Sequence, residues 1–220
     1  MKRATGLLLI LLMLFAVSRS SSAAVAVFFG DHLENRGEID YNGAGDSGRF
    51  ESGLVSLSYA QETKWVITYQ FGEFYDGSVK KELDFFDIQV GYPIANDQSG
   101  LLYLTITAIN YSGFKGSGAI PDIWRHEADG GLLGFEVVGF LADKLQFEFS
   151  FRRSVVGSFR LNDDQSSLNL SLLKLKIQYL LTDYLGLVLL YQLKDFNADA
   201  IAFNLSEEFQ TTHWGLIYRF

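Results

Sequence analysis

The chain has 220 residues, 48% hydrophobic and 15% aromatic, which is long enough for one domain with a sizeable core. Acidic residues (26) outnumber basic ones (18). This excess argues against broad nucleic-acid binding, because such binding needs Lys and Arg to displace counterions from phosphates. The absence of cysteine excludes disulfides, thiolate zinc sites and thiol catalysis.

The first segment has the pattern of a secretory signal peptide. A basic start, MKRATG, is followed by the apolar run LLLILLMLFAV and then by the small residues of SRSSSAAVA. The apolar run is too short to cross a bilayer core of roughly 30 Å as a helix. We expect a signal peptide at 1–24, with cleavage after Ala24 or Ala26, and one exported domain over 25–220.

The rest of the chain shows the two-residue alternation of β-strands. In KLQFEFSFRRS (144–154), Leu or Phe occupies every second position up to Phe151, and the residues between are polar or charged. Because successive side chains of a strand point to opposite faces, this segment separates an aromatic face from a polar face. Similar segments predict ten strands, near residues 25–35, 50–60, 65–75, 82–93, 100–111, 131–141, 144–155, 166–181, 184–195 and 208–220.

The connections between these segments alternate in length. Short turns fall near Glu62, Asn96, Asp143 and 182–183, and longer polar connections at 37–49, 76–81, 112–130, 157–165 and 196–207. This arrangement is typical of a transmembrane antiparallel up-and-down β-barrel, whose bulky aromatic faces meet lipid and whose polar faces line the lumen. Ten strands is the first interpretation and eight the second. A soluble lipocalin-like barrel is the alternative to a membrane barrel.

One predicted strand changes its pattern part-way. In SLNLSLLKLKIQYLL (167–181), apolar residues occupy even positions up to Leu172 and odd positions from Leu173 to Tyr179. A strand that keeps one lipid-facing side cannot do this without an extra residue. We therefore predict a β-bulge at Leu172–Leu173.

The C-terminal stretch THWGLIYRF places an aromatic or aliphatic residue at every second position and ends on Phe220. It resembles the C-terminal signature of Gram-negative outer-membrane β-barrel proteins, in which Trp214, Leu216, Tyr218 and Phe220 would be recognised by the barrel-assembly machinery. The resemblance implies a bacterial outer-membrane location, periplasmic termini and an even number of strands. It also implies contact with outer-membrane lipids, including lipopolysaccharide, and with periplasmic chaperones during biogenesis. We expect a monomer that binds no nucleic acid.

Charged residues on the predicted polar faces form a candidate lumen network. Its members are Asp87, Glu136, Glu148, Arg152, Lys174, Lys176 and Arg219. Opposite charges this close in a narrow lumen would pair and offset one another's desolvation. The network either fills the interior as a structural element or forms a charged constriction that selects ions.

The histidines give little sign of catalysis. His126 falls in the longest predicted loop, where Asp122 or Asp129 could join it in a hydrolase at the barrel mouth. We expect instead that His126 is a solvated loop residue and that His213 faces the lumen. No two histidines lie two or four residues apart, so we expect no metal site and no cofactor.

These features predict a non-enzymatic surface or envelope scaffold with acidic outward loops and a charge-filled lumen. The alternative is a narrow, porin-like passive pore for small ions or solutes. A barrel-mouth hydrolase is a third hypothesis.

Overall fold

The computed structural model describes residues 24–220 apart from 77–78, 98–99, 116–123, 162–163 and 201–202. Nearly all of the predicted signal peptide lies outside the described residues. Within the described part, no helix has the length and apolar character needed to span a membrane.

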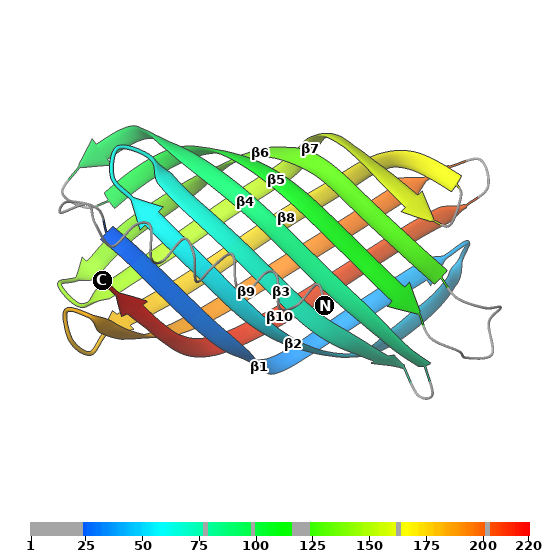
Figure 1. Ribbon diagram of the computed structural model, residues 1–220, viewed down its shortest axis with the longest axis horizontal. Coiled ribbons are helices and arrows are strands. Elements are labelled where there is room, and N and C mark those ends of the chain that lie inside the picture. Colours follow the sequence, from blue (N-terminus) through cyan, green and yellow to red (C-terminus); the bar gives the residue numbers. More distant parts are fainter. Residues whose placement is uncertain (1–23, 77–78, 98–99, 116–123, 162–163, 201–202) are drawn as a thin grey trace.

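The described chain forms ten antiparallel strands that close into one barrel, because β1 pairs with both β2 and β10 (Figure 1). Strands β2 to β9 each pair with their two neighbours in the sequence, so the topology is up-and-down. The strands are β1 (Ala24–Tyr41), β2 (Ala44–Ala60), β3 (Lys64–Asp76), β4 (Val79–Asp97), β5 (Gly100–Lys115), β6 (Trp124–Ala142), β7 (Leu145–Leu161), β8 (Asp164–Leu180), β9 (Leu185–Asp199) and β10 (Asn204–Arg219). The predicted fold class and the count of ten strands are confirmed.

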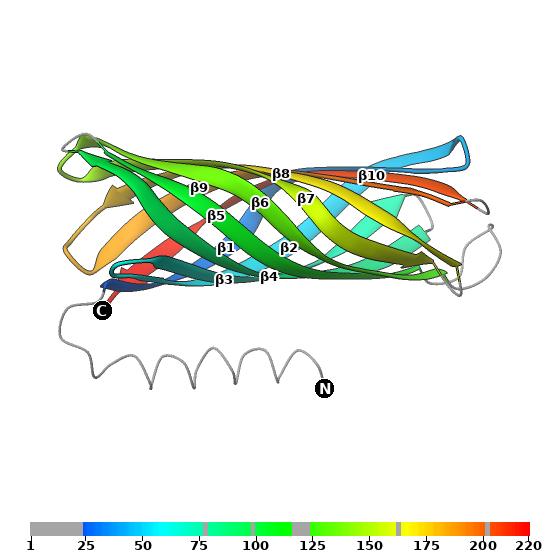
Figure 2. The same ribbon diagram turned by 90° about the horizontal axis from the view of Figure 1, so that it is seen from above.

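The two ends of the barrel differ in the strand termini that they hold. The terminal end holds the start of β1 and the end of β10, and the opposite loop end is where the odd-numbered strands finish (Figures 1 and 2). We call the two parts of the barrel the terminal half and the loop half. They meet at the level of Leu172 and Leu173 in β8.

In the terminal half the outward face is apolar. Large hydrophobic side chains are exposed on nine of the ten strands, among them Phe29, Trp65, Phe86, Ile106, Phe135, Phe151, Ile177, Leu189 and Leu216. An exposed apolar band of this kind around a closed barrel is the surface that contacts lipid in membrane barrels. The predicted outward orientation of the aromatic faces is therefore confirmed for this half.

In the loop half the outward face is polar and the inward face is apolar. Outward positions are polar or charged, including Glu51, Glu73, Glu82, Asp84, Asn110, Asp129, Arg160, Asp195, Asn197, Glu208 and Gln210. The interior holds one continuous apolar cluster, which includes Ile39, Phe50, Phe74, Leu83, Phe85, Ile109, Phe159, Leu170, Phe196, Leu205 and Phe209. Charged side chains are costly in hydrocarbon, so the loop half lies beyond the lipid and is built like a water-soluble barrel.

The predicted β-bulge at Leu172–Leu173 is wrong. Leu172 pairs with Arg152 and Lys194, Leu173 pairs with Phe151 and Leu193, and pairing is unbroken on both sides. Even-numbered side chains of β8 point inward along its whole length. The apolar set changes from even to odd positions because the surroundings change, from an apolar interior to surrounding lipid, while the register stays constant.

Real irregularities occur in two other strands near the same level. The register between β1 and β10 shifts between His32 and Glu34. The pairing between β7 and β8 is interrupted between Arg153 and Ser158. In the second gap the Ser154 hydroxyl donates to the Leu168 carbonyl (3.1 Å) and accepts from the Leu170 amide (2.9 Å). This side chain satisfies the backbone groups of β8 that the bulge leaves unpaired.

The long outward connections predicted from sequence are mostly strand. The predicted connection at 37–49 is a hairpin that reverses at Asn42 and Gly43, whose φ angles of 53° and 82° fit a type I′ turn. These segments resembled loops because their outward residues are polar. In fact, their apolar residues point inward at every second position.

Arginine substitutions on the outward face of β4 test the position of the lipid band. Val90→Arg places a cation in the middle of the apolar band and should destabilise the folded protein by about 2–4 kcal/mol. Glu82→Arg lies in the loop half, directly opposite Glu73, and should cost less than about 1 kcal/mol or stabilise the protein. Urea unfolding in lipid vesicles measures both, and equal losses would contradict the assignment.

Candidate functional site

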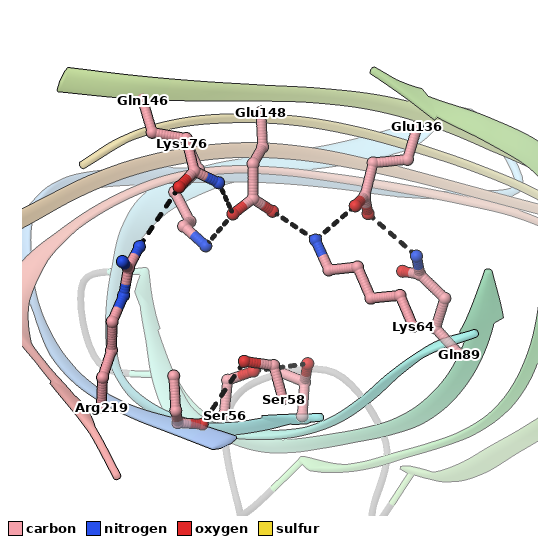
Figure 3. A network of polar contacts seen from close by, with 11 residues as sticks. Ser56, Ser58, Lys64, Gln89, Glu136, Gln146, Glu148, Lys176 and Arg219 are labelled. Carbon is pink, nitrogen blue, oxygen red and sulfur yellow. Dashed lines mark hydrogen bonds and ion pairs between the residues drawn. The ribbon is translucent and has the colours of Figure 1, made fainter. Parts of the chain in front are cut away.

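The terminal half encloses a connected network of charged and polar side chains (Figure 3). Lys64 Nζ bridges two carboxylates, since it donates to Glu136 and, at 2.9 Å, to Glu148. Lys176 donates to the second oxygen of Glu148, and Gln89 Nε2 donates to Glu136 at 2.9 Å. These residues come from β3, β4, β6, β7 and β8, so the network reaches across the bore.

The other predicted network members also lie inside this half. Arg152 is 3.8 Å from Asp87 and donates to the Thr107 hydroxyl at 3.4 Å. Arg219 donates to the Gln146 amide oxygen at 3.2 Å, which links β10 to β7. Lys174 faces the same interior, but among the described residues it makes no hydrogen bond or ion pair.

A second polar chain crosses the bore where the two halves meet. Lys194 donates to Gln70 Oε1, and Gln70 Nε2 donates to Ser52 Oγ at 3.1 Å. Ser52 also accepts from Asn35 at 2.9 Å, so its single proton is left for His213 Nε2, 2.9 Å away. His213 therefore faces the bore as predicted, with Nε2 as acceptor.

A third group lies inside the apolar cluster of the loop half. Glu207 is fully buried and accepts hydrogen bonds from Lys81 Nζ and, at 2.6 Å, from the Tyr111 hydroxyl. His126 Nε2 lies 3.4 Å from the same carboxylate, and its ring stacks on Phe159. An ion pair this deep is costly to desolvate, and it persists only while both charges and their hydrogen bonds are present.

Two expectations about this region are wrong. His126 was expected in a solvated loop, but it lies in β6 with no exposed surface. Asp129, its suggested partner, points to the outside and binds Asn110 at 2.6 Å, while Asp122 lies outside the described residues. Glu207 falls in the predicted acidic connection at 196–207, but it belongs to β10 and lies inside the barrel. Both errors follow from reading the polar loop half as loops.

The sequence interpretation did not place Lys64, Lys81 and Glu207 in the lumen, although alternation could have found each of them. Lys64 shares the inward face of β3 with Thr68 and Gln70, but it was assigned to a turn. Lys81 shares the inward face of β4 with Asp87. Glu207 lies two residues before Phe209 on the same inward face of β10.

The predicted assembly residues of β10 lie on the lipid-facing side. Trp214, Leu216 and Tyr218 alternate with buried residues and are exposed, as is the terminal Phe220. Their recognition during assembly stays a prediction. The part of the chain that the structure describes contains no group of three or more His, Asp or Glu placed to hold a metal ion.

Comparison with solved structures finds outer-membrane barrels of similar fold. The outer-membrane protease OmpT from Escherichia coli is 10% identical, with a TM-score of 0.57, over 92% of this chain and 98% of OmpT. Neisserial surface protein A is 11% identical, with a TM-score of 0.45, over 91% of this chain and 98% of that protein. No protein-family model matches the chain, and no curated protein sequence does.

The closed barrel, its exposed apolar band and the OmpT-like fold define the class. The chain is a β-barrel protein of the bacterial outer membrane. At 10% identity the likeness to OmpT concerns the fold alone.

The buried Lys81–Glu207 pair can be tested by removing one charge and then both. Lys81→Met leaves the Glu207 carboxylate uncompensated inside the apolar cluster and should cost about 3–5 kcal/mol of folding free energy. The double variant Lys81→Met/Glu207→Gln should recover most of this loss. Arg160→Gln on the outer surface is the control and should change stability by less than about 0.5 kcal/mol. A double variant no more stable than Lys81→Met in urea unfolding would contradict the pairing.

Proposed function

We propose that the protein is a non-enzymatic envelope protein whose closed barrel holds a polar loop half above the outer membrane. The observation that carries this proposal is the filling of the bore at successive levels. Ion pairs cross the terminal half, and an apolar cluster occupies the loop half. A passive pore needs a continuous hydrated path, and an apolar constriction excludes water and ions.

The outer surface of the loop half supports a role in contact with other molecules. Carboxylates lie directly opposite one another across neighbouring strands. One such row is Glu51, Glu73 and Glu82 on β2, β3 and β4, and another is Glu38, Glu208 and Asp195 on β1, β10 and β9. Directly opposed like charges destabilise a sheet. Their presence favours a surface whose charge serves solubility or contact, with lipopolysaccharide among the molecules within reach.

Single-channel recording in planar bilayers tests the closed bore. Refolded mature protein, shown to be folded by a heat-dependent gel shift, should give no discrete conductance steps. As a control, a porin of known conductance is added last to the same bilayer. Its conductance steps show that an inserted channel would have been detected. Regular steps whose ion selectivity changes in Lys176→Gln would overturn the proposal and establish a passive pore.

A further inference from the structure

The interior of the terminal half carries more positive than negative charge. Among the described residues, the inward-facing cations are Lys64, Arg152, Lys174, Lys176, Lys194 and Arg219, and the inward-facing carboxylates are Asp87, Glu136 and Glu148. The carboxylates are matched by Lys64, Lys176 and Arg152. Lys194 and Arg219 donate to neutral amides, and Lys174 makes no hydrogen bond or ion pair in the described part of the chain. An enclosed excess of cations favours a bound anion.

A small cavity lies beside the unpaired Lys174. It measures about 20 Å³, and its lining includes Lys64, Lys174, Lys176, Glu148, Ser56 and Ser58. Figure 3 shows Lys64, Glu148 and Lys176 on one side of the bore and Ser56 and Ser58 on the other, and all five residues line this cavity. This volume holds a species of about the size of one water molecule.

The polar groups of the cavity fit an anion better than a cation. Its one carboxylate, Glu148, already binds Lys64 and Lys176. Gln192 lines the same cavity, is 7% exposed, and its Oε1 has no partner among the described residues. Rotation of this amide would present N–H donors to a bound anion, because the placement of its oxygen and nitrogen is interchangeable.

We propose that this cavity is a halide site, occupied by chloride, in which the Lys174 ammonium is the principal ligand. The Ser56 hydroxyl and the Gln192 amide can donate from the other walls. A volume of about 20 Å³ suits a monatomic ion better than a phosphate or a lipid headgroup. The bound chloride would neutralise Lys174 in the way that Glu148 neutralises Lys176.

Thermal unfolding of the refolded full-length mature protein tests the site. The unfolding midpoint is followed by the heat-dependent gel shift in sodium chloride and in sodium gluconate of equal ionic strength. Binding to the folded state alone predicts a saturable rise of the midpoint with chloride. Gluconate, which is too large for the cavity, should give no saturable rise. Equal responses to the two salts would overturn the proposal.

Two variants locate the effect. In Lys174→Met the chloride concentration for half of the effect should rise at least about tenfold, equivalent to 1.4 kcal/mol of binding. Arg160→Gln removes an exposed cation from the outer surface and should respond like the wild type. A Lys174→Met protein with the wild-type chloride response would show that chloride acts elsewhere.

A direct measurement covers the case in which Lys174→Met fails to fold. Crystals of the wild-type protein grown in sodium bromide should show an anomalous peak between Lys174 and Ser56. Bromide peaks confined to the outer surface would overturn the assignment.

Discussion

Each strand of this barrel meets lipid along one part of its length and water along the rest, and this constraint decides where most apolar side chains point. The exceptions include Phe28, Leu54, Val188, Leu190 and Ile217, which form a small apolar cluster inside the terminal half. In β4 the outward residues are Glu82 and Asp84 in the loop half, and Phe86 and Ile88 in the terminal half. The inward residues change in the opposite sense, from Leu83 and Phe85 to Asp87 and Gln89. The terminal half can therefore be polar inside only because lipid covers its outside. The loop half needs an apolar core because nothing but water surrounds it.

The filling of the bore follows from the same constraint. A loop half that folds like a soluble barrel must fill its interior with packed apolar side chains, and aromatic pairs such as Phe50–Phe209 and Tyr111–Phe196 do so. The terminal half is then left with polar groups that must satisfy one another. The shared Glu148 carboxylate, bound by Lys64 and Lys176, is the result. Under the proposed function, contact with other molecules then falls to the outer surface and to small interior sites.

Sequence alternation was sufficient for the strand count, the barrel and the lipid-facing side of the terminal half. It could not reveal which stretch of a strand lies outside the lipid. Alternation shows that a strand has an apolar face and a polar face, but it does not show which of the two faces points into the barrel. This ambiguity produced the wrong bulge at Leu172–Leu173 and the loop assignment of His126. It also hid the Lys81–Glu207 pair, since partners 126 positions apart meet only after the barrel closes.

The short hairpin between β1 and β2 has a consequence for recognition at the loop end. A long outer loop must lose conformational entropy when it captures a partner, whereas strands that continue to a two-residue reversal at Asn42–Gly43 have already lost it during folding. This hairpin is preorganised and holds its contact groups at a fixed height above the lipid band. It would therefore discriminate strictly by shape, and lengthening this reversal should relax selectivity before it weakens the barrel.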